Sequence, residues 1–207
     1  MPDGTSQDIK RGRKFDQVID GARDIFMSVG FEGASVDDIA RAAGVSKATL
    51  YSYFPDKRLL FLEVARQDCV RHADLAMASV DFTGPVREVL TTVGTQMVDF
   101  ITSEFGQKVF RLCVAESARF PQLGREFYES GPLLVRGKLI GFFESAIARG
   151  ELRIEDLPLA ADQFHELCKA DLFPRLVFAL DREFSPAQKR RVVDGAVETF
   201  LARYGVT

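Results

Sequence analysis

The 207-residue sequence predicts an all-α protein. Apolar residues recur at helical spacing in one segment after another, as they do in amphipathic helices. No stretch of useful length alternates apolar and polar residues, as a half-buried strand does. Glycines, prolines and capping residues separate the helical segments, so the expected helices can be justified in order.

The first helix is expected at residues 15–29, where apolar residues follow 3.6-residue spacing and Gly30 is placed to end the helix. A short second helix should follow. Its start is marked by Ser35 and Asp38, which match the S-x-x-D pattern of a capped N-terminus. Gly44 should end it, because a left-handed backbone costs least at glycine.

The third expected helix is barely two turns long. Ser46 is its candidate N-cap, and the helix cannot run through Pro55, because the residue before a proline avoids the helical region. A long helix then begins at Pro55 or Asp56 and continues to about Met77. Two short helices joined by a glycine turn and packed on a first helix are typical of a helix-turn-helix.

The rest of the chain begins after a linker at residues 81–85 and is also helical. Helical spacing recurs near 85–104, 106–118, 122–150, 158–180 and 186–204, with breaks expected at Gly106, Pro121, Gly131-Pro132, Gly150 and Pro158. The last helix is the best marked, since Ser185 and Gln188 form a capping box around a first-turn proline and Gly205 follows its end.

These elements divide the chain into two expected domains. Residues 1–60 are a helix-turn-helix domain with a basic arm at residues 10–14, and residues 61–207 are a larger helical domain. The arm is equally compatible with a solvated, frayed terminus. The net charge of −3 argues against a chain that coats nucleic acid everywhere, although it leaves room for a local basic patch.

Composition excludes several other classes. Hydrophobic residues make up 46% and charged residues 28%, as in globular proteins, and no apolar run is long enough to cross a membrane. The N-terminus lacks the apolar stretch of a secretory signal, so a cytoplasmic location is expected. Three distant cysteines form neither a disulfide framework nor a zinc pattern. Cys69 and His72 lie three apart, but two ligands do not make a metal site, and we expect no metal and no cofactor.

An enzyme is the main rival class. The sequence HELCK at 165–169 falls one residue short of the zinc-protease motif H-E-x-x-H, because Lys169 takes the place of the second histidine. Nucleophile-elbow, phosphate-loop and dinucleotide motifs are missing, and two histidines leave little for acid–base chemistry. We therefore expect no catalysis.

The stretch AGVSKATLYSYFPDK at residues 43–57 has the residue types of a DNA-reading helix. The second helix of a helix-turn-helix lies in the major groove, and its N-terminal residues reach base edges. Here these residues are Ser46, Lys47, Ala48 and Thr49. Lys47 can donate to guanine acceptors, and Thr49 can hydrogen-bond a base or touch a thymine methyl group.

Three further residues of this stretch are candidate phosphate contacts. The hydroxyl groups of Tyr51 and Tyr53 can donate to phosphates, although a surface tyrosine alone proves little. Lys57 sits in the first turn of the next helix, where free backbone N–H groups also favour a phosphate.

The run from Gly30 to Phe61, GFEGASVDDIARAAGVSKATLYSYFPDKRLLF, resembles the N-terminal domain of the TetR/AcrR family of bacterial one-component repressors. The matching positions are Ser35, Ile39-Ala40, Ala43 to Ser46, Tyr51 with Phe54, and Lys57. On this resemblance Ser35 joins the expected DNA contacts. The segment from Ala115 to Pro132 and the ending FLARYG further resemble the AefR-like branch of C-terminal domains.

The resemblance implies a homodimer whose last two long helices form an intersubunit four-helix bundle. A two-fold dimer should bind a nearly palindromic operator in double-stranded DNA. Regulators of this family usually release DNA when a small molecule binds the C-terminal domain, and the long helix that starts at Pro55 is expected to transmit the change. The apolar face of the last helix, residues 186–204, is compatible with this bundle. Core packing within one subunit would give the same pattern.

An apolar or aromatic effector is expected, because fourteen of the 18 phenylalanines lie after residue 60. Phenylalanine is equally what helical cores are built from. Polar groups among apolar neighbours are better indicators, although Glu116 with Arg119 also fits an intrahelical ion pair and His165 a structural histidine. The candidate effector contacts are Phe110, Glu116, Arg119, Phe120, Phe142, Phe164 and His165.

Two alternatives to a ligand-released repressor remain. A constitutive DNA-binding protein without an effector would have no need of the large second domain or of the acidic balance. Activation also stays open, because the position of the operator decides between activation and repression.

Overall fold

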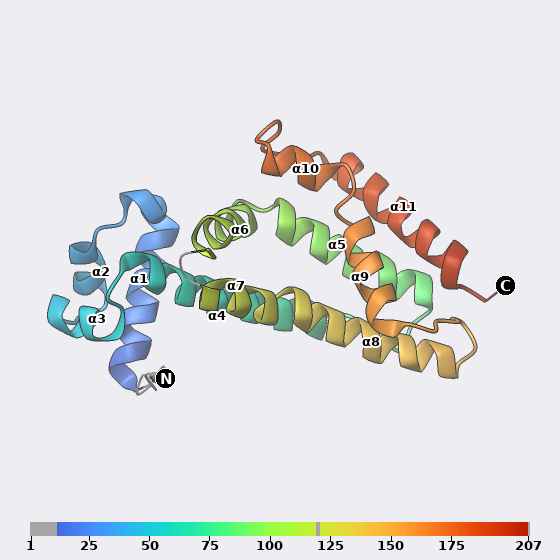
Figure 1. The fold of residues 1–207 in the computed structure, drawn as a ribbon, viewed down its shortest axis with the longest axis horizontal. Helices are drawn as coiled ribbons and strands as arrows, with labels where there is room; N and C mark the ends of the chain where they lie inside the picture. Colours follow the sequence, from blue (N-terminus) through green and yellow to red (C-terminus); the bar gives the residue numbers. More distant parts are fainter. Residues whose placement is uncertain (1–11, 119–120, 207) are drawn as a thin grey trace. The chain divides into compact units, whose positions relative to one another are not determined.

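The computed structural model describes residues 12–118 and 121–206, in which the regular structure is helical apart from one isolated bridge between Leu152 and Gly205 (Figure 1). The predicted all-α fold is confirmed. By contacts the chain divides into a first unit, residues 1–68, and a second unit, residues 69–207. This boundary lies inside helix α4, Lys57–Ala78, as does the boundary expected at residue 60.

The first unit begins with α1, Arg13–Gly33. Its helical backbone is interrupted at Gly30, whose φ of 74° lies in the left-handed region, and a last turn follows to Gly33. The predicted end at Gly30 is therefore a kink within a slightly longer element. The face of α1 that carries Val18, Ile19 and Ala22 is buried, in keeping with its predicted apolar spacing.

Two short helices follow, α2 at Val36–Ala42 and α3 at Lys47–Tyr53. The hydroxyl oxygen of Ser35 accepts a hydrogen bond from the backbone N–H of Asp38 at 3.1 Å, so the predicted N-cap of α2 is confirmed. Ser46 caps α3 in the same way, with the N–H of Thr49 at 3.1 Å. The turn between them is made by Gly44, with a φ of 63°.

The core of the first unit joins α1 to all three following helices. The rings of Phe15 and Phe54 lie 5.5 Å apart, and Leu50 of α3 is buried with them. Gly21 of α1 lies directly against α2, since a Cβ atom at this position would be 2.5 Å from the backbone nitrogen of Ala43. Helix α1 thus packs closely against the end of α2 and against the buried side of α3.

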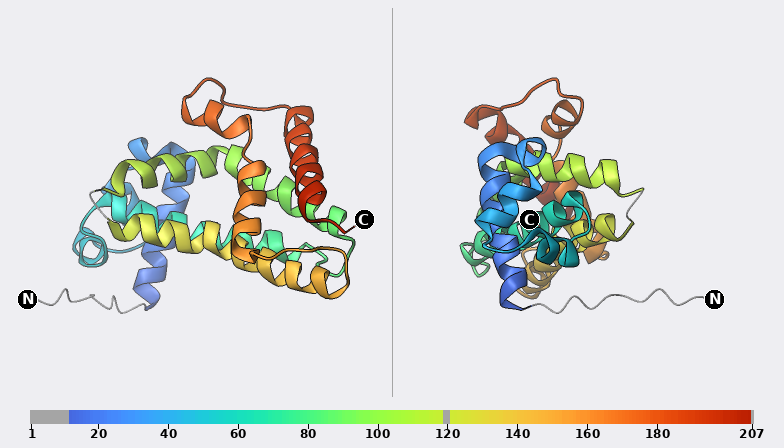
Figure 2. Two further views of the ribbon diagram at one scale, coloured as in Figure 1. Left: turned by 45° about the vertical axis from the view of Figure 1, so that its right-hand side comes forward. Right: turned by 90° about the vertical axis from the view of Figure 1, so that its left-hand side faces the viewer.

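The second unit contains the remaining helices. They are α5 (Val86–Thr102), α6 (Glu104–Glu116), α7 (Pro121–Ser130), α8 (Pro132–Ala148), α9 (Leu157–Leu167), α10 (Leu172–Val177) and α11 (Pro186–Tyr204). Helix α11 packs on α5 and α9, α9 crosses α8, and α6 contacts α5 and α7 (Figures 1 and 2). The predicted break at Gly131-Pro132 is confirmed.

Two details of the predicted helices are wrong. Gly106 does not break the chain, because α6 begins at Glu104 and Gly106 donates its N–H to the hydroxyl oxygen of Ser103. The segment 158–180 is two helices, since the backbone becomes left-handed at Asp171, with a φ of 65°, before α10 begins.

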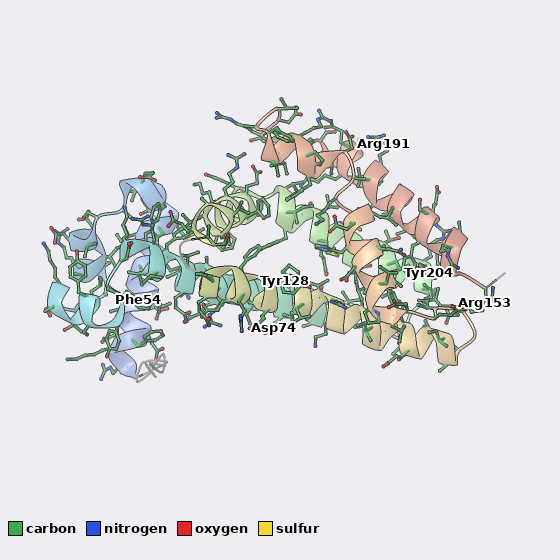
Figure 3. All side chains as sticks on the ribbon, in the orientation of Figure 1. Phe54, Asp74, Tyr128, Arg153, Arg191 and Tyr204 are labelled. Carbon is green, nitrogen blue, oxygen red and sulfur yellow. The ribbon has the colours of Figure 1, made fainter. Side chains whose placement is uncertain are left out.

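Aromatic rings form the centre of the second unit. The ring of Phe200 on α11 lies 5.1 Å from Phe143, 5.5 Å from Phe164 and 4.8 Å from Tyr204. The hydroxyl of Tyr204, labelled near the end of α11 in Figure 3, donates to the side-chain oxygen of Gln163 at 2.5 Å. The predicted capping box at Ser185 is confirmed in both directions, so α11 starts where the sequence indicates.

Two cysteines of the second unit are buried thiols. Cys113 on α6 is 4% exposed and Cys168 after α9 is fully covered. Burial disfavours the thiolate and raises the pKa of each to about 12. Within the described part of the chain, no helix is both long enough and apolar enough to span a membrane.

Candidate DNA-reading surface and ligand pocket

The N-terminal turn of α3 presents three of the four predicted base-reading residues to solvent. Ser46, Lys47 and Ala48 are exposed, and Thr49 is half-buried. The hydroxyl oxygens of Ser46 and Thr49 lie 2.9 Å apart and share a hydrogen bond. Both side chains therefore help to close the first turn of the helix, and their remaining lone pairs are available to a base.

Lys47 is neutralised by a carboxylate of the neighbouring helix. Its ammonium forms an ion pair with Asp37 of α2, and both side chains are more than half exposed, at 59% and 53%. This pair was not predictable from local sequence patterns, because the two residues lie on different helices. The only local signal is the Asp37-Asp38 doublet in the first turn of α2.

Asp38, next to Asp37, accepts hydrogen bonds from two residues of its own segment. It accepts a hydrogen bond from the Ser35 hydroxyl at 2.6 Å and one from Arg41 at 2.8 Å. These two contacts, that of Ser35 first, hold the pKa of the Asp38 carboxyl below its ordinary value. Ser35 therefore acts here as the cap of α2, and its exposed position leaves it near the surface that α2 and α3 share.

The two tyrosines differ in their surroundings. Tyr51 is 48% exposed, so its hydroxyl can reach a partner outside the protein. Tyr53 is half-buried and packs edge to face on Phe15, with the ring centroids 5.8 Å apart. The sequence-based expectation that at least one tyrosine is exposed is met by Tyr51, while the ring of Tyr53 contributes to the core.

Lys57, a predicted phosphate contact, has an internal role that the sequence did not indicate. Its Nζ donates to the carbonyl oxygens of Phe31, at 2.9 Å, and Ala34, at 3.0 Å. The same nitrogen lies 4.5 Å from the centre of the Phe31 ring. A cation placed on the carbonyls at the end of α1 stabilises that helix terminus. One N–H of the ammonium remains for a phosphate.

The basic arm is only partly within the described residues. Arg13 and Lys14 are exposed in the first turn of α1. Lys10 and Arg11 lie outside the described residues.

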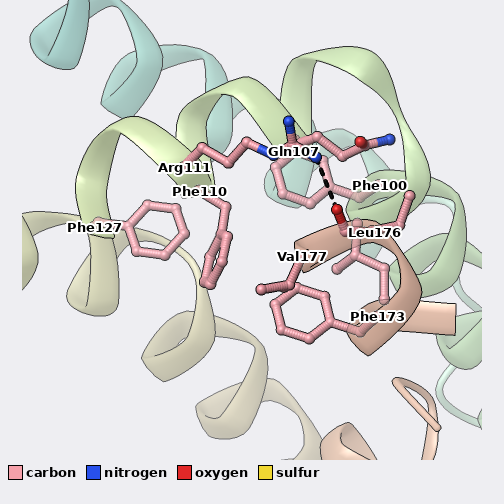
Figure 4. A pocket seen from close by; sticks show the side chains of 10 residues that line it. Phe100, Gln107, Phe110, Arg111, Phe127, Phe173, Leu176 and Val177 are labelled. Carbon is pink, nitrogen blue, oxygen red and sulfur yellow. Dashed lines mark hydrogen bonds between the residues drawn. The ribbon is translucent and has the colours of Figure 1, made fainter. Parts of the chain in front are cut away.

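The second unit contains an apolar pocket between α5, α6, α7 and α10, with a cavity volume of about 60 Å³. Its apolar walls are the side chains of Phe100, Phe110, Phe127, Phe173, Leu176 and Val177. The rings of Phe110 and Phe173 meet edge to face, 4.9 Å between centroids (Figure 4). Among the residues predicted to contact an effector, Phe110 lines this pocket.

The other described residues among the predicted effector contacts lie elsewhere. Phe142 and Phe164 belong to the hydrophobic core and are 3% and 0% exposed. Glu116 is half-buried near the end of α6, and Arg119 and Phe120 lie outside the described residues. Phe142, Phe164 and Glu116 are not among the residues that line the pocket.

His165 is half-buried on α9, with Nδ1 3.5 Å from a carboxylate oxygen of Glu166. Burial lowers the pKa of its imidazole, and the nearby ammonium of Lys169 contributes in the same direction. His165 does not line the described pocket, and its setting is that of a neutral structural histidine.

Two polar side chains lie beside the aromatic walls of the pocket. The side-chain amide of Gln107 donates to the carbonyl oxygen of Thr102 at 3.0 Å. The guanidinium of Arg111 donates to the carbonyl oxygen of Leu176, in the last turn of α10, at 2.7 Å (Figure 4). Among the described residues, no group of three or more His, Cys, Asp or Glu side chains is arranged to hold a metal ion.

Comparison with known proteins relates both units to bacterial regulators. Residues 18–64 match the family described as "Bacterial regulatory proteins, tetR family". Residues 88–206 match the family described as "AefR-like transcriptional repressor, C-terminal domain". Together the two matches cover the helix-turn-helix and nearly all of the second unit.

Solved structures support the same relationship over almost the whole chain. A TetR-family transcriptional regulator of Mesorhizobium loti is 32% identical, with a TM-score of 0.76, and the match covers 94% of this chain and 98% of that one. The flavonoid-responsive regulator FrrA is 33% identical, with a TM-score of 0.71 and the same coverage.

A curated relative matches over a shorter stretch. The transcriptional repressor AcnR of Corynebacterium efficiens is 40% identical over 58 residues, which is 28% of this chain. The match covers only 31% of the length of that repressor.

Proposed function

The chain belongs to the TetR family, with an AefR-like C-terminal domain, and on that premise we propose that it is a homodimeric repressor released from a palindromic operator by a small apolar or aromatic effector. It is a DNA-binding transcriptional regulator and not an enzyme, and relatives of this chain are named repressors. The proposal rests above all on the exposed first turn of α3, which Ser46 caps.

The geometry of α3 supports DNA reading. Ser46 and Gly44 fix the start of the helix, and Leu50 fixes its rotation, because this side chain is buried. Lys47 and Ala48 are then presented on the outer surface of a rigid scaffold. We assign base contacts to Ser46 through Thr49 and phosphate contacts to Tyr51, Tyr53 and Lys57, with Ser35 nearby.

Exposed apolar side chains at the end of α10 and just after it support dimerisation. Val177, Phe178 and Leu180 are 42%, 75% and 72% exposed, which is unusual for adjacent large apolar residues on a monomer surface. A second copy of the chain would cover them together with the outer face of α11. A two-fold dimer presents two α3 helices, so the operator should be a near-palindrome.

The aromatic walls of the pocket support an aromatic effector. The name of FrrA describes that relative as responsive to flavonoids, which are aromatic compounds. We therefore place the effector against Phe110 and Phe173 rather than against Phe142 and Phe164, which are fully packed in the core.

Binding to the DNA upstream of the protein's own gene tests this function. Fluorescence anisotropy with excess nonspecific competitor should give saturable binding with a dissociation constant of about 10 nM or below. The stoichiometry should be two subunits, or a multiple of two, per near-palindrome. If binding is no tighter than to competitor, selection from random DNA is the next experiment. Recovery of a palindrome would indicate an operator elsewhere in the genome. Recovery of no preferred sequence would indicate a nonspecific DNA-binding protein and would contradict the proposal.

Asp37→Asn should raise affinity for nonspecific DNA and reduce discrimination. The carboxylate of Asp37 neutralises Lys47 in the free protein, so its removal leaves one more cation for phosphates. The slope of log affinity against log salt should steepen by about one unit on nonspecific DNA. Asp24→Asn, an equal charge change at an exposed position on α1, is the control. Equal effects of the two variants would contradict a specific role for the ion pair.

Lys47→Ala and Lys57→Ala should affect DNA binding differently. Lys47→Ala should relax base preference, because it removes a donor to base edges. Lys57→Ala should weaken binding to all sequences alike and reduce the salt slope by about one unit. It should also destabilise the first unit by about 2 kcal/mol, because two carbonyls lose a charged donor. Lower stability with an unchanged salt slope would remove Lys57 from the phosphate contacts.

A further inference from the structure

The pocket of the second unit combines aromatic walls with a single charged side chain. Four phenylalanines line it, and Arg111 is the one ionisable residue among the lining side chains. Arg111 is exposed, so its guanidinium lies where the pocket meets solvent. The other polar lining residue, Gln107, already donates its amide to the carbonyl of Thr102. Arg111 is therefore the residue of this pocket best placed to bind a polar group of a ligand.

The positive charge of Arg111 has no carboxylate partner among the described residues. Its hydrogen bond goes to a neutral acceptor, the carbonyl oxygen of Leu176, at 2.7 Å (Figure 4). Arg175, on the same short helix as Leu176, is by contrast paired with Asp181 at 2.7 Å. A guanidinium binds a carboxylate more strongly than a carbonyl, because it can form two parallel, charge-assisted hydrogen bonds.

The carbonyl of Leu176 can lose Arg111 without being left unsatisfied. It also accepts a hydrogen bond from the backbone N–H of Ala179 at 3.1 Å. An unpaired buried acceptor is costly, but an acceptor that keeps one donor is not. Arg111 is thus able to exchange this bond for one to a ligand.

We propose that the pocket binds an aromatic carboxylate. Its ring packs against the edge-to-face pair of Phe110 and Phe173, and its carboxylate binds the guanidinium of Arg111 in place of the Leu176 carbonyl. The cavity of about 60 Å³ is small for a whole drug-sized ligand, so the charged end of the ligand remains at the mouth, where Arg111 lies. The proposal rests on the proposed function in one respect only, that this pocket is the effector site.

Loss of the bond between Arg111 and Leu176 also has a structural consequence within the second unit. It is a direct hydrogen bond from α6 to the last turn of α10, which lie far apart in sequence. A bound carboxylate would therefore release α6 from α10 at this point. The side chain of Arg111 would thus both bind the ligand and change the contact between α6 and α10.

The test uses a matched pair of probes, 2-naphthoate and the neutral 2-naphthamide, on the full-length protein. The chain has no tryptophan, so naphthalene fluorescence can be followed without a tryptophan background. The wild-type protein should bind the carboxylate at least tenfold more tightly than the amide. In Arg111→Gln the carboxylate should lose this advantage while the amide binds as before.

Three variants separate recognition from folding. Arg111→Lys keeps the charge without the planar pair of donors, so it should retain part of the preference for naphthoate. Arg87→Gln, an equal charge loss at an exposed position on α5, should change nothing. Ile101→Phe, which fills the pocket, should weaken both probes together. Far-UV circular dichroism confirms that each variant is folded.

Three results would overturn the inference: equal binding of the two probes, a preference that survives Arg111→Gln, or no binding of either probe at millimolar concentration. Because probe binding is measured without DNA, each of these results leaves the repressor function standing. Failure of operator binding would contradict the proposed repressor function, but it would leave the binding of aromatic carboxylates to the pocket untouched.

Discussion

Gly21→Ala should destabilise the first unit by about 3 kcal/mol, which is the upper range for overpacking a tight contact. The same substitution should remove specific DNA binding. A Cβ at this position would lie 2.5 Å from the backbone nitrogen of Ala43 and 2.7 Å from its Cα. Backbone atoms cannot rotate away as the end of a side chain can. Helices α1 and α2 must therefore separate, which displaces the Gly44 turn and with it the first turn of α3.

Chemical unfolding and operator titration would measure this effect. Gly137→Ala is the matched control, because Gly137 lies on α8 with no atom within 4 Å of its added Cβ. This variant should instead gain about 1 kcal/mol, since alanine is the better helix former. A Gly21→Ala protein with native operator affinity would show that α1 and α2 can move apart at little cost.

Phe200→Ala should cost about 3 to 5 kcal/mol of stability, as truncation of a fully buried phenylalanine typically does. Phe200 is 1% exposed and contacts aromatic rings from α8 and α9 as well as Tyr204 on its own helix. Its removal leaves a cavity where three helices meet. These rings hold one another, so the surroundings cannot collapse to fill the space.

Thermal and denaturant unfolding would quantify the loss. Phe200→Leu retains most of the volume and should cost only about 1 kcal/mol. The two variants together give a graded series at one site. If Phe200→Ala costs less than about 1 kcal/mol, the aromatic cluster does not carry the stability of the second unit.

The start of each well-capped helix could be predicted from the sequence. Ser35, Ser46 and Ser185 each cap a helix at the expected position, because a cap is a bond between residues two or three apart. The all-α fold follows in the same way from local periodicity. Such features depend only on neighbours in the sequence, so one chain is enough to reveal them.

Features that depend on distant neighbours were not predictable. Gly106 signals a close approach and not a helix end, because its Cβ would lie 2.2 Å from the carbonyl oxygen of Phe100. The carboxylate partner of Lys47 and the carbonyl partners of Lys57 lie on other elements. In each case the decisive contact is tertiary, and the sequence alone does not contain its geometry.

The candidate effector site shows the same limit. Phe110 lines the pocket, whereas Phe142 and Phe164 are core residues. Each of these three phenylalanines lies in a segment of helical spacing, so composition could not separate them. Arg111 and Gln107 were missed because a polar residue on an exposed helix face is ordinary until the cavity beside it is known.

The two buried thiols allow local opening of the second unit to be measured in the native protein. With a pKa of about 12, only about one thiol in ten thousand is ionised at pH 8, and burial also blocks access to an alkylating reagent. Alkylation at Cys113 and Cys168, resolved by mass spectrometry, therefore proceeds through transient exposure of each site. Cys113 lies on α6 and Cys168 just after α9, so their two rates compare the local opening of two parts of one unit.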